Sequence, residues 1–243
     1  MSIYKNQRKI FKIRHRNVLR CAGCGGIIRD AYYRFKGLDA VYCTNCVNNR
    51  KRCFNCGLPV GIKYWELSDG RFICNSCIGK IVIDSSKARV LFRRVREVLS
   101  NSLDLKVKHG IKIHIVDREF LSKISKSYER NSQVLGIFKY TRRGDHEIYE
   151  IYILYGLSEA LTVATMAHEL AHVWCQEKRI KSLDDDEETF ATWVGYIAMK
   201  LLGYQKEAKE YAETNGITLI NLNKIIPIIN LLVNEHTKSK VKG

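Results

Sequence analysis

The sequence predicts an α+β protein made of two unlike parts. Four Cys-x-x-Cys pairs lie between residues 21 and 77, with short strand-like segments between them. From residue 84 onward, a helical pattern is followed by alternating strand patterns up to residue 154 and then by further helical patterns. We therefore expect a basic N-terminal arm over residues 1–20, a cysteine-rich module over residues 21–83 and a larger domain over residues 84–243.

Composition limits the class of protein. Hydrophobic residues make up 46% of the 243 residues, which is enough for a packed core. The start of the chain lacks the apolar core of a signal peptide, and no run of about eighteen uninterrupted apolar residues predicts a membrane helix. These features favour a cytoplasmic protein. In that setting, paired cysteines indicate zinc ligands rather than disulfides.

The formal net charge of +16 is concentrated in the first 83 residues, which contain 16 Lys and Arg but only 4 Asp and Glu. Two four-thiolate sites filled with Zn²⁺ would cancel about four of these positive charges. Charge is therefore a weak argument for nucleic-acid binding, which we do not favour. We expect the arm to be a solvated terminus with a short strand over residues 14–19; an arm that contacts phosphates or a protein partner is the alternative.

The cysteine pairs form an internal repeat. In each half, one pair is followed by a second pair after seventeen or eighteen residues, and Gly25 and Gly57 follow the leading pairs where the turn needs unusual dihedral angles. Four thiolates leave no open position for water, so we expect two structural zinc sites. The repeat favours sequential pairing, with a cross-braced arrangement as the alternative. The predicted ligand sets are Cys21, Cys24, Cys43 and Cys46, followed by Cys53, Cys56, Cys74 and Cys77.

The segments between the cysteine pairs and the larger domain have predicted elements of their own. Residues 31–35, 63–67 and 69–73 are predicted hairpin strands. In the larger domain, we predict strands over residues 111–116, 134–140 and 147–154, and helices over 85–103, 117–127, 158–178, 186–202, 205–213 and 218–235. Ser85 or Ser86 caps the first of these helices. Its apolar side is formed by Val90, Leu91, Val95, Val98 and Leu99.

The central motif is His168-Glu169-Leu170-Ala171-His172, inside the helix predicted over residues 158–178. Residues four apart lie on one helix face, so His168 and His172 can bind one metal ion while Glu169 takes a proton from water. The helix also has a separate apolar stripe for the core, which leaves the two histidines free for another role. We therefore expect a catalytic zinc site with Glu169 as the general base.

A catalytic zinc ion usually has three protein ligands, and we expect a carboxylate from the next helix as the third. Glu187 and Glu188 are both candidates, although acids at a helix start also compensate the helix dipole. A group that stabilises the oxyanion is also needed. The candidates for that group are Tyr155, His146 and Tyr196. Cys175 is predicted to be a packed thiol away from the metal, and His114 an exposed strand residue.

Two resemblances refine this interpretation. The cysteine spacing resembles a LIM domain with two sequential zinc sites, although Cys43 stands where LIM domains commonly have His. The segment from His168 to Trp174, followed by Glu188-Thr189-Phe190-Ala191, resembles the gluzincin aminopeptidases, in which the ligand Glu precedes a small residue and then Phe-Ala. That resemblance implies Glu188 as the third ligand. Together the two imply a LIM-like double zinc-ribbon module followed by a zincin-type metallopeptidase domain.

A broader likeness covers about residues 50–204. Tyr155-Gly156-Leu157 leads into the His-Glu-x-x-His helix, and Asp69-Gly70-Arg71 precedes Cys74. This order is similar to the plant LIM-containing, ubiquitin-activated peptidases that limit organ growth, and to their bacterial relatives. The resemblance implies a zinc metalloendopeptidase for protein substrates, with one catalytic and two structural Zn²⁺ and a zinc module that recruits or regulates. The acidic ubiquitin-interacting helices of the plant proteins have no match in the basic residues 1–20.

Two alternatives use the same motifs. The first is a nucleic-acid-associated protease similar to SprT-like enzymes, which also combine His-Glu-x-x-His with a zinc-binding module; the basic arm is its only motivation. The second is a LIM-type scaffold whose peptidase half is catalytically silent. No sequence feature identifies a substrate, an activator or an oligomeric state.

Overall fold

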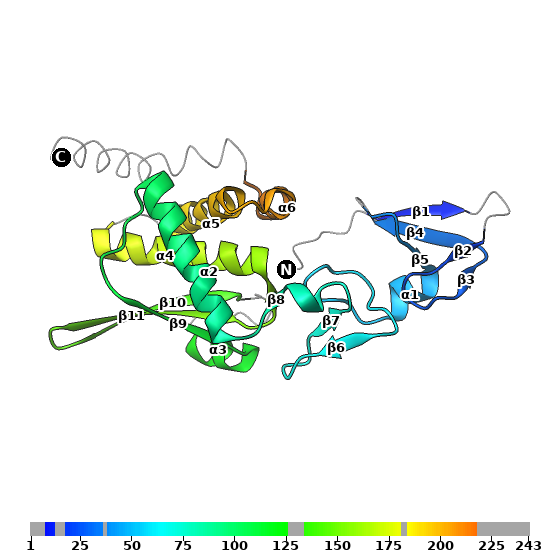
Figure 1. The fold of residues 1–243 in the computed structure, drawn as a ribbon, viewed down its shortest axis with the longest axis horizontal. Helices are drawn as coiled ribbons and strands as arrows, with labels where there is room; N and C mark the ends of the chain where they lie inside the picture. Colours follow the sequence, from blue (N-terminus) through cyan, green and yellow to red (C-terminus); the bar gives the residue numbers. More distant parts are fainter. Residues whose placement is uncertain (1–7, 13–17, 36–37, 126–133, 181–183, 218–243) are drawn as a thin grey trace. The chain divides into compact units, whose positions relative to one another are not determined.

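The computed structural model describes residues 8–12, 18–35, 38–125, 134–180 and 184–217 of the chain. Helices and small sheets are mixed along it, which confirms the α+β class. The chain divides into two compact units, Met1–Ile81 and Val82–Gly243, and Figure 1 shows the course of the chain through each of them. Each unit is described by itself below.

The first unit is built on a three-stranded antiparallel sheet in the order β1-β4-β5. Its strands are β1 (Arg8–Lys12), β4 (Ala31–Phe35) and β5 (Val41–Cys43). One face of β4 enters a small core, because Tyr33 and Phe35 are buried while their neighbours along the strand are more exposed. Tyr42, Cys46 and Val47 complete that core, so a zinc-ligand cysteine is part of the packing.

Part of the predicted solvated arm is in fact a strand. β1 pairs with β4 from Arg8 opposite Phe35 to Lys12 opposite Ala31. The Phe11 ring stacks on Tyr32 with 5.2 Å between the ring centroids. Cross-strand aromatic contacts of this kind stabilise strand pairing, and a composition argument does not detect them. The strand predicted over residues 14–19 lies mostly outside the described residues.

The other elements of this unit are short. The strands β2 (Leu19–Arg20) and β3 (Ile27–Ile28) pair, and β6 (Tyr64–Glu66) and β7 (Phe72–Cys74) form the second predicted hairpin. Helix α1 spans Thr44–Asn49, and the short helix η1 (Ile78–Lys80) leads to β8 (Ile81–Val82).

The spacer between Cys46 and Cys53 connects the two halves of this unit tightly. The Arg50 guanidinium donates hydrogen bonds to the carbonyl oxygens of Val60 and Gly61, at 3.2 and 2.9 Å. The Arg52 guanidinium donates to the carbonyl oxygen of Val47, at the end of α1. These bonds fix the second half against the first.

The second unit packs helices against a three-stranded sheet in the order β10-β11-β9. The strands β10 (Gly136–Arg143) and β11 (His146–Leu154) form an antiparallel hairpin, while β9 (Ile111–Val116) runs parallel to β11 on its other side. β10 is therefore an edge strand. Figure 1 shows α4 (Glu159–Lys178) and α5 (Asp184–Leu201) above this sheet and α3 (Arg118–Ile124) below it, while α2 (Ser85–Leu103) runs obliquely across α4 and also contacts β9.

Helix α4 is the buried centre of the second unit. It begins after β12 (Leu157–Ser158), where the Ser158 hydroxyl accepts a hydrogen bond from the Leu161 amide at 3.3 Å. The predicted apolar stripe is confirmed as core: Val163, Met166, Ala167, Leu170, Val173 and Trp174 are buried. The final described helix, α6 (Gln205–Asn215), ends at Gly216 with a φ of 63°, which fits the predicted glycine stop.

Two predictions about α2 were wrong. Its N-cap is Asp84 rather than a serine, because the Asp84 carboxylate accepts hydrogen bonds from the amides of Ser86 and Lys87 at 2.8 and 2.9 Å. Val90, predicted on the apolar side, is 52% exposed, whereas Phe92 is buried. Packing on the neighbouring elements sets which face of this helix is buried, and periodicity alone assigned one residue wrongly.

The helix predicted over residues 218–235 lies outside the described residues. Within the described part of the chain, no helix has both the length and the apolar character needed to cross a membrane.

Candidate metal centres

The structure brings the eight paired cysteines together in two groups. The groups are Cys21, Cys24, Cys43 and Cys46, and Cys53, Cys56, Cys74 and Cys77. This confirms sequential pairing rather than a cross-braced arrangement. The Sγ atoms of Cys24 and Cys43 are 3.9 Å apart, and those of Cys56 and Cys74 are 3.7 Å apart. A tetrahedral Zn²⁺ bound at 2.3 Å would separate its sulfur ligands by about 3.8 Å, whereas a disulfide would need about 2.05 Å.

Backbone amides also donate hydrogen bonds to some of these sulfur atoms, which stabilises the thiolate form. The amides of Gly23 and Cys43 point at Cys21 Sγ, at 3.3 and 3.2 Å, and the Cys74 amide points at Cys53 Sγ at 3.3 Å. Gly25 and Gly57 close the two leading turns with φ values of 74° and 65°, a conformation that side chains disfavour. Each group therefore has the turn, the donors and the ligand spacing of a structural zinc site.

The third group lies in the second unit and consists of His168, His172 and Glu188. The Nε2 atoms of the two histidines are 3.1 Å apart. The two carboxylate oxygens of Glu188 lie 3.3 Å from His168 Nε2 and from His172 Nε2. A tetrahedral ion bound at about 2.05 Å would separate these donor atoms by about 3.3 Å, so the three side chains fit a Zn²⁺ ion.

The two adjacent acids of α5 have different positions. Glu188 lies among the ligand atoms, whereas Glu187 contacts the far side of the ring, with 2.7 Å between its Oε1 and His172 Nδ1. A carboxylate that accepts from the other ring nitrogen fixes the tautomer and orientation of a metal-binding histidine. The structure thus separates two residues that the motif spacing left equivalent. α4 and α5 lie side by side, which brings these acids to the histidines.

The charges at this group favour a bound cation. Burial disfavours the charged form of His172, but Glu187 and Glu188 more than offset that effect and raise the pKa of His172 to about 10. Hydrogen bonds from His168 and His172 hold the pKa of Glu188 below its usual range. A site that stabilises positive charge on His172 in this way also favours a divalent ion.

Glu169 is buried beside the three candidate ligands, with 6% of its surface exposed. Burial raises the pKa of its carboxyl group, while the nearby His168 and His172 act in the opposite direction. The Phe138 amide of β10 donates a hydrogen bond to this carboxylate. A carboxylate in this position is placed to exchange a proton with water at the metal group.

The three oxyanion candidates lie at different distances from this site. His146 begins β11 at the hairpin end opposite Gly136, seven residue pairs away, which is about 23 Å along an extended strand. The structure therefore does not bring His146 to the Gly136 end of the hairpin. Tyr155 follows β11 at the near end, and its amide donates to Val116 at 2.8 Å. Tyr196 lies eight residues after Glu188 on α5, or about 12 Å along the helix axis.

Tyr211 was not singled out from the sequence. It lies on α6, is buried, and its pKa is raised by burial and by the negative charges of Glu169 and Glu188. Its hydroxyl faces the crossing of α4 and α5, 3.3 Å from where a Cβ on Gly195 would stand. The periodicity of α6 gives this tyrosine an ordinary core position, so no pattern in the sequence connects it with the metal group.

Two other predicted residues lie away from the metal group. Cys175 is buried, and burial raises the pKa of its thiol to about 12, which agrees with a packed and protonated side chain. His114 is half-buried rather than exposed, because its ring stacks on Tyr152 and its Nε2 lies 3.2 Å from Glu150. Among the described residues, neither joins a metal-binding group.

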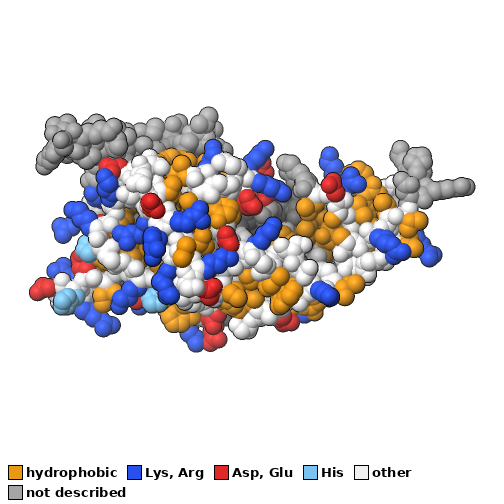
Figure 2. Space-filling model, in the orientation of Figure 1, with side chains coloured by type: hydrophobic (Ala, Val, Ile, Leu, Met, Phe, Trp, Pro, Cys, Tyr) orange, Lys and Arg blue, Asp and Glu red, His pale blue; other side chains and the backbone are white. Residues whose placement is uncertain are grey.

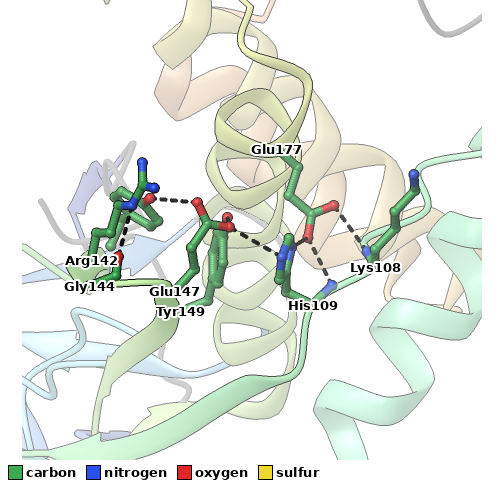
Figure 3. A network of polar contacts seen from close by, with 8 residues as sticks. Lys108, His109, Arg142, Gly144, Glu147, Tyr149 and Glu177 are labelled. Atoms are coloured by element: carbon green, nitrogen blue, oxygen red, sulfur yellow. Dashed lines mark hydrogen bonds and ion pairs between the residues drawn. The ribbon is translucent and has the colours of Figure 1, made fainter.

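A polar network fixes the C-terminal end of α4, five residues beyond His172 (Figure 3). The Glu177 carboxylate accepts hydrogen bonds from the amides of Lys108 and His109, at 3.0 and 2.9 Å. His109 Nδ1 lies 2.6 Å from the same carboxylate, and its Nε2 lies 3.3 Å from Glu147. The loop before β9, the hairpin and α4 are therefore connected at one point.

Basic side chains form no single large patch on the face shown in Figure 2. Lys and Arg are spread among Asp, Glu and apolar side chains there. Figure 2 shows one face only and gives no added support to the nucleic-acid alternative.

These features define a protein with a LIM-like zinc module and a His-His-Glu group formed by the buried helix α4 and the neighbouring helix α5. The chain is similar to Protein DA1 of Arabidopsis thaliana, at 25% identity over 171 residues that cover 56% of this chain and 32% of that protein. Protein DA1-related 7 of the same plant is 25% identical over 197 residues, covering 67% and 35%. LIM domain-containing protein HDR3 of Oryza sativa subsp. japonica is 24% identical over 197 residues, covering 67% and 39%.

These relatives support a LIM-containing protein related to the plant DA1 proteins. The chain spans about a third of the length of the curated relatives it matches. No family model matches the chain, and no solved structure matches it.

Proposed function

We propose that this chain is a zinc metalloendopeptidase that hydrolyses peptide bonds in protein substrates, with the LIM-like module serving recruitment or regulation. The observation that carries the proposal is the convergence of His168, His172 and Glu188 within ligand distance of one another, beside the buried Glu169. A structural site would be closed by a fourth protein ligand. Three ligands with an adjacent carboxylate are the set that a hydrolytic zinc site needs.

The reaction follows from this arrangement. A Zn²⁺ ion held by the three ligands would supply Lewis-acid polarisation of the scissile carbonyl and lower the pKa of its water to about 7. Glu169 accepts a proton from the attacking water on its carboxylate and returns it to the leaving nitrogen as the peptide bond breaks. Glu187 holds the His172 ring in the orientation that points Nε2 into the site.

The edge strand β10 provides a place for the substrate. The Leu154 amide donates to the Leu135 carbonyl, so alternate residues of β10, Gly136, Phe138 and Tyr140, turn their backbone groups away from β11. An extended peptide can add to this edge by main-chain hydrogen bonds to these groups other than the Phe138 amide, which donates to Glu169. Such bonds are insensitive to side-chain identity. This geometry favours a protein or peptide substrate over a small molecule.

The test is cleavage of casein by the zinc-loaded chain and by Glu169→Gln. We expect the substitution to lower the rate by about 100- to 10,000-fold, because it removes the proton acceptor and leaves the ligands in place. Glu97→Gln, at an exposed position of α2, is the matched control and should cleave as the parent does. Metal analysis should find three zinc ions per chain in all three proteins.

Two results would contradict the proposal. Equal cleavage by the parent and Glu169→Gln would show that the activity comes from elsewhere. Two zinc ions per chain with no cleavage would support the scaffold alternative, in which the His-His-Glu group is silent.

A further inference from the structure

Strand β10 approaches the general base more closely than a side chain would allow. A Cβ atom placed on Gly136 would lie 2.5 Å from Thr165 Cγ2, 2.9 Å from Glu169 Oε1 and 3.1 Å from Glu169 Cγ. The backbone of Gly136 does not have a positive φ, so its conformation would admit other residues. The requirement for glycine therefore comes from the contact with α4 alone.

The same strand also holds the carboxylate by a hydrogen bond. Phe138 is one of the residues whose backbone groups point away from β11, so its amide would otherwise face the open edge of the sheet. It donates instead to the Glu169 carboxylate. Gly136 and Phe138 are two residues apart, so the close approach at the first brings the amide of the second to Glu169.

We propose that Gly136 and the Phe138 amide are positioning residues for Glu169. Gly136 lets β10 lie directly against α4, and the Phe138 amide fixes the direction of the Glu169 carboxylate beside the metal ligands. The geometric part stands on the contacts above, and the catalytic consequence rests on the proposed peptidase function. The expected effect of Gly136→Ala is displacement of the Glu169 carboxylate with the ligands left in place.

The chain offers a matched control and a way to separate packing from positioning. A Cβ on Gly110 would meet no atom within 4 Å, so Gly110→Ala makes the same chemical change without a contact. Thr165→Ser removes the methyl group that a Gly136 Cβ would meet, while its hydroxyl can keep the bond to the Leu161 carbonyl at 2.8 Å. The double variant Gly136→Ala/Thr165→Ser therefore relieves the packing contact and keeps the contact with Glu169.

The first measurement is amide hydrogen exchange by NMR on the zinc-loaded protein, which needs no turnover. Phe138 should exchange at least about tenfold faster in Gly136→Ala, in the double variant and in Glu169→Ala than in the parent and Gly110→Ala. The Ile137 amide, which faces β11, is the internal control and should stay slow in the double variant. Unchanged exchange at Phe138 in both Glu169→Ala and the double variant would overturn the proposal.

The second measurement is steady-state cleavage of a peptide substrate. We expect kcat of Gly136→Ala and of the double variant to fall by about 100-fold with little change in KM, the effect of misplacing a reacting group. Recovery of kcat by Thr165→Ser would show that Gly136 serves packing only, and would contradict the positioning role. If the parent and Glu169→Gln cleave equally, the peptidase proposal fails, while Phe138 exchange still decides the geometric part.

Discussion

The chemistry proposed for this chain depends on a few residues, and two of them are neighbours in the sequence but have different roles. Glu187 and Glu188 follow each other on α5, yet one contacts His172 Nδ1 and the other lies between the two Nε2 atoms. A helix turns by 100° per residue, so neighbouring side chains diverge and cannot share one position. Substitutions of the two acids should therefore have different effects on zinc binding.

We expect Glu188→Gln to lose the third zinc ion, because a neutral amide is a poor replacement for a charged ligand. Glu187→Gln should keep that ion but bind it about 10- to 100-fold more weakly, the usual cost of losing an outer carboxylate partner. Zinc competition with a chromogenic chelator measures both. The reverse order of affinities would assign the ligand role to Glu187.

At the scale of residues, the sequence predicted the members of the three candidate metal-binding groups. The spacing of His168 and His172 is a property of any helix, so their convergence followed from the local pattern. The choice of Glu188 over Glu187 came from a resemblance. The length of the hairpin, which no local pattern shows, places His146 at the end of β11 far from Gly136. The place of Tyr211 near Gly195 of α5 depends on the packing of α6 against α5.

At the scale of elements, α4 is held near its middle and at its C-terminal end by contacts that are distant in sequence. Gly136 of β10 touches it near Thr165, and the Glu177 network ties its last turn to residues 108 and 109. The Glu177 side chain is only 5% exposed and accepts from two backbone amides. Hydrogen bonds to a charged group that is itself buried contribute more than those of exposed neutral pairs, so this contact should matter for stability.

Glu177→Gln should lower the free energy of unfolding of the second unit by about 2 kcal/mol, because the amide group can satisfy only part of this set of donors. Glu119→Gln is the matched control, since its bond to Lys123 on α3 is exposed and should contribute little. Denaturant unfolding of the zinc-loaded protein, followed by Trp fluorescence, gives the comparison. Equal midpoints for the two variants would show that the network in Figure 3 is dispensable.

At the scale of the whole molecule, the two units depend on metal in different ways. The core of the first unit includes Cys21 and Cys46 themselves, together with a few aromatic residues. The second unit has an extensive apolar core around α4, with Ile151, Ile153, Trp174 and Phe190 almost fully buried. Small modules that cannot bury enough apolar surface obtain their stability from zinc.

Removal of zinc by a strong chelator should unfold the first unit and leave the second folded, because each structural zinc site contributes on the order of 10 kcal/mol or more. Hydrogen exchange with mass spectrometry should show lost protection in residues 18–77 and retained protection in α4. Re-addition of zinc should restore both the protection and any cleavage. Loss of protection in α4 together with the first unit would contradict this division.

The sequence by itself determined the parts of this protein that depend on local spacing. Four Cys-x-x-Cys pairs and one His-Glu-x-x-His helix specify ligands within one turn or one helical repeat, where backbone geometry leaves little freedom. The alternation of residues in β9 and the apolar stripe of α4 were visible for the same reason.

Only the tertiary structure decided how distant segments meet. It paired β1 with β4, placed Asp84 rather than a serine at the start of α2, and gave Glu187 and Glu188 separate positions. It also set Gly136 of the edge strand against Glu169. Such contacts depend on the relative positions of whole elements, which are fixed by the packing of many side chains and not by any short run of residues.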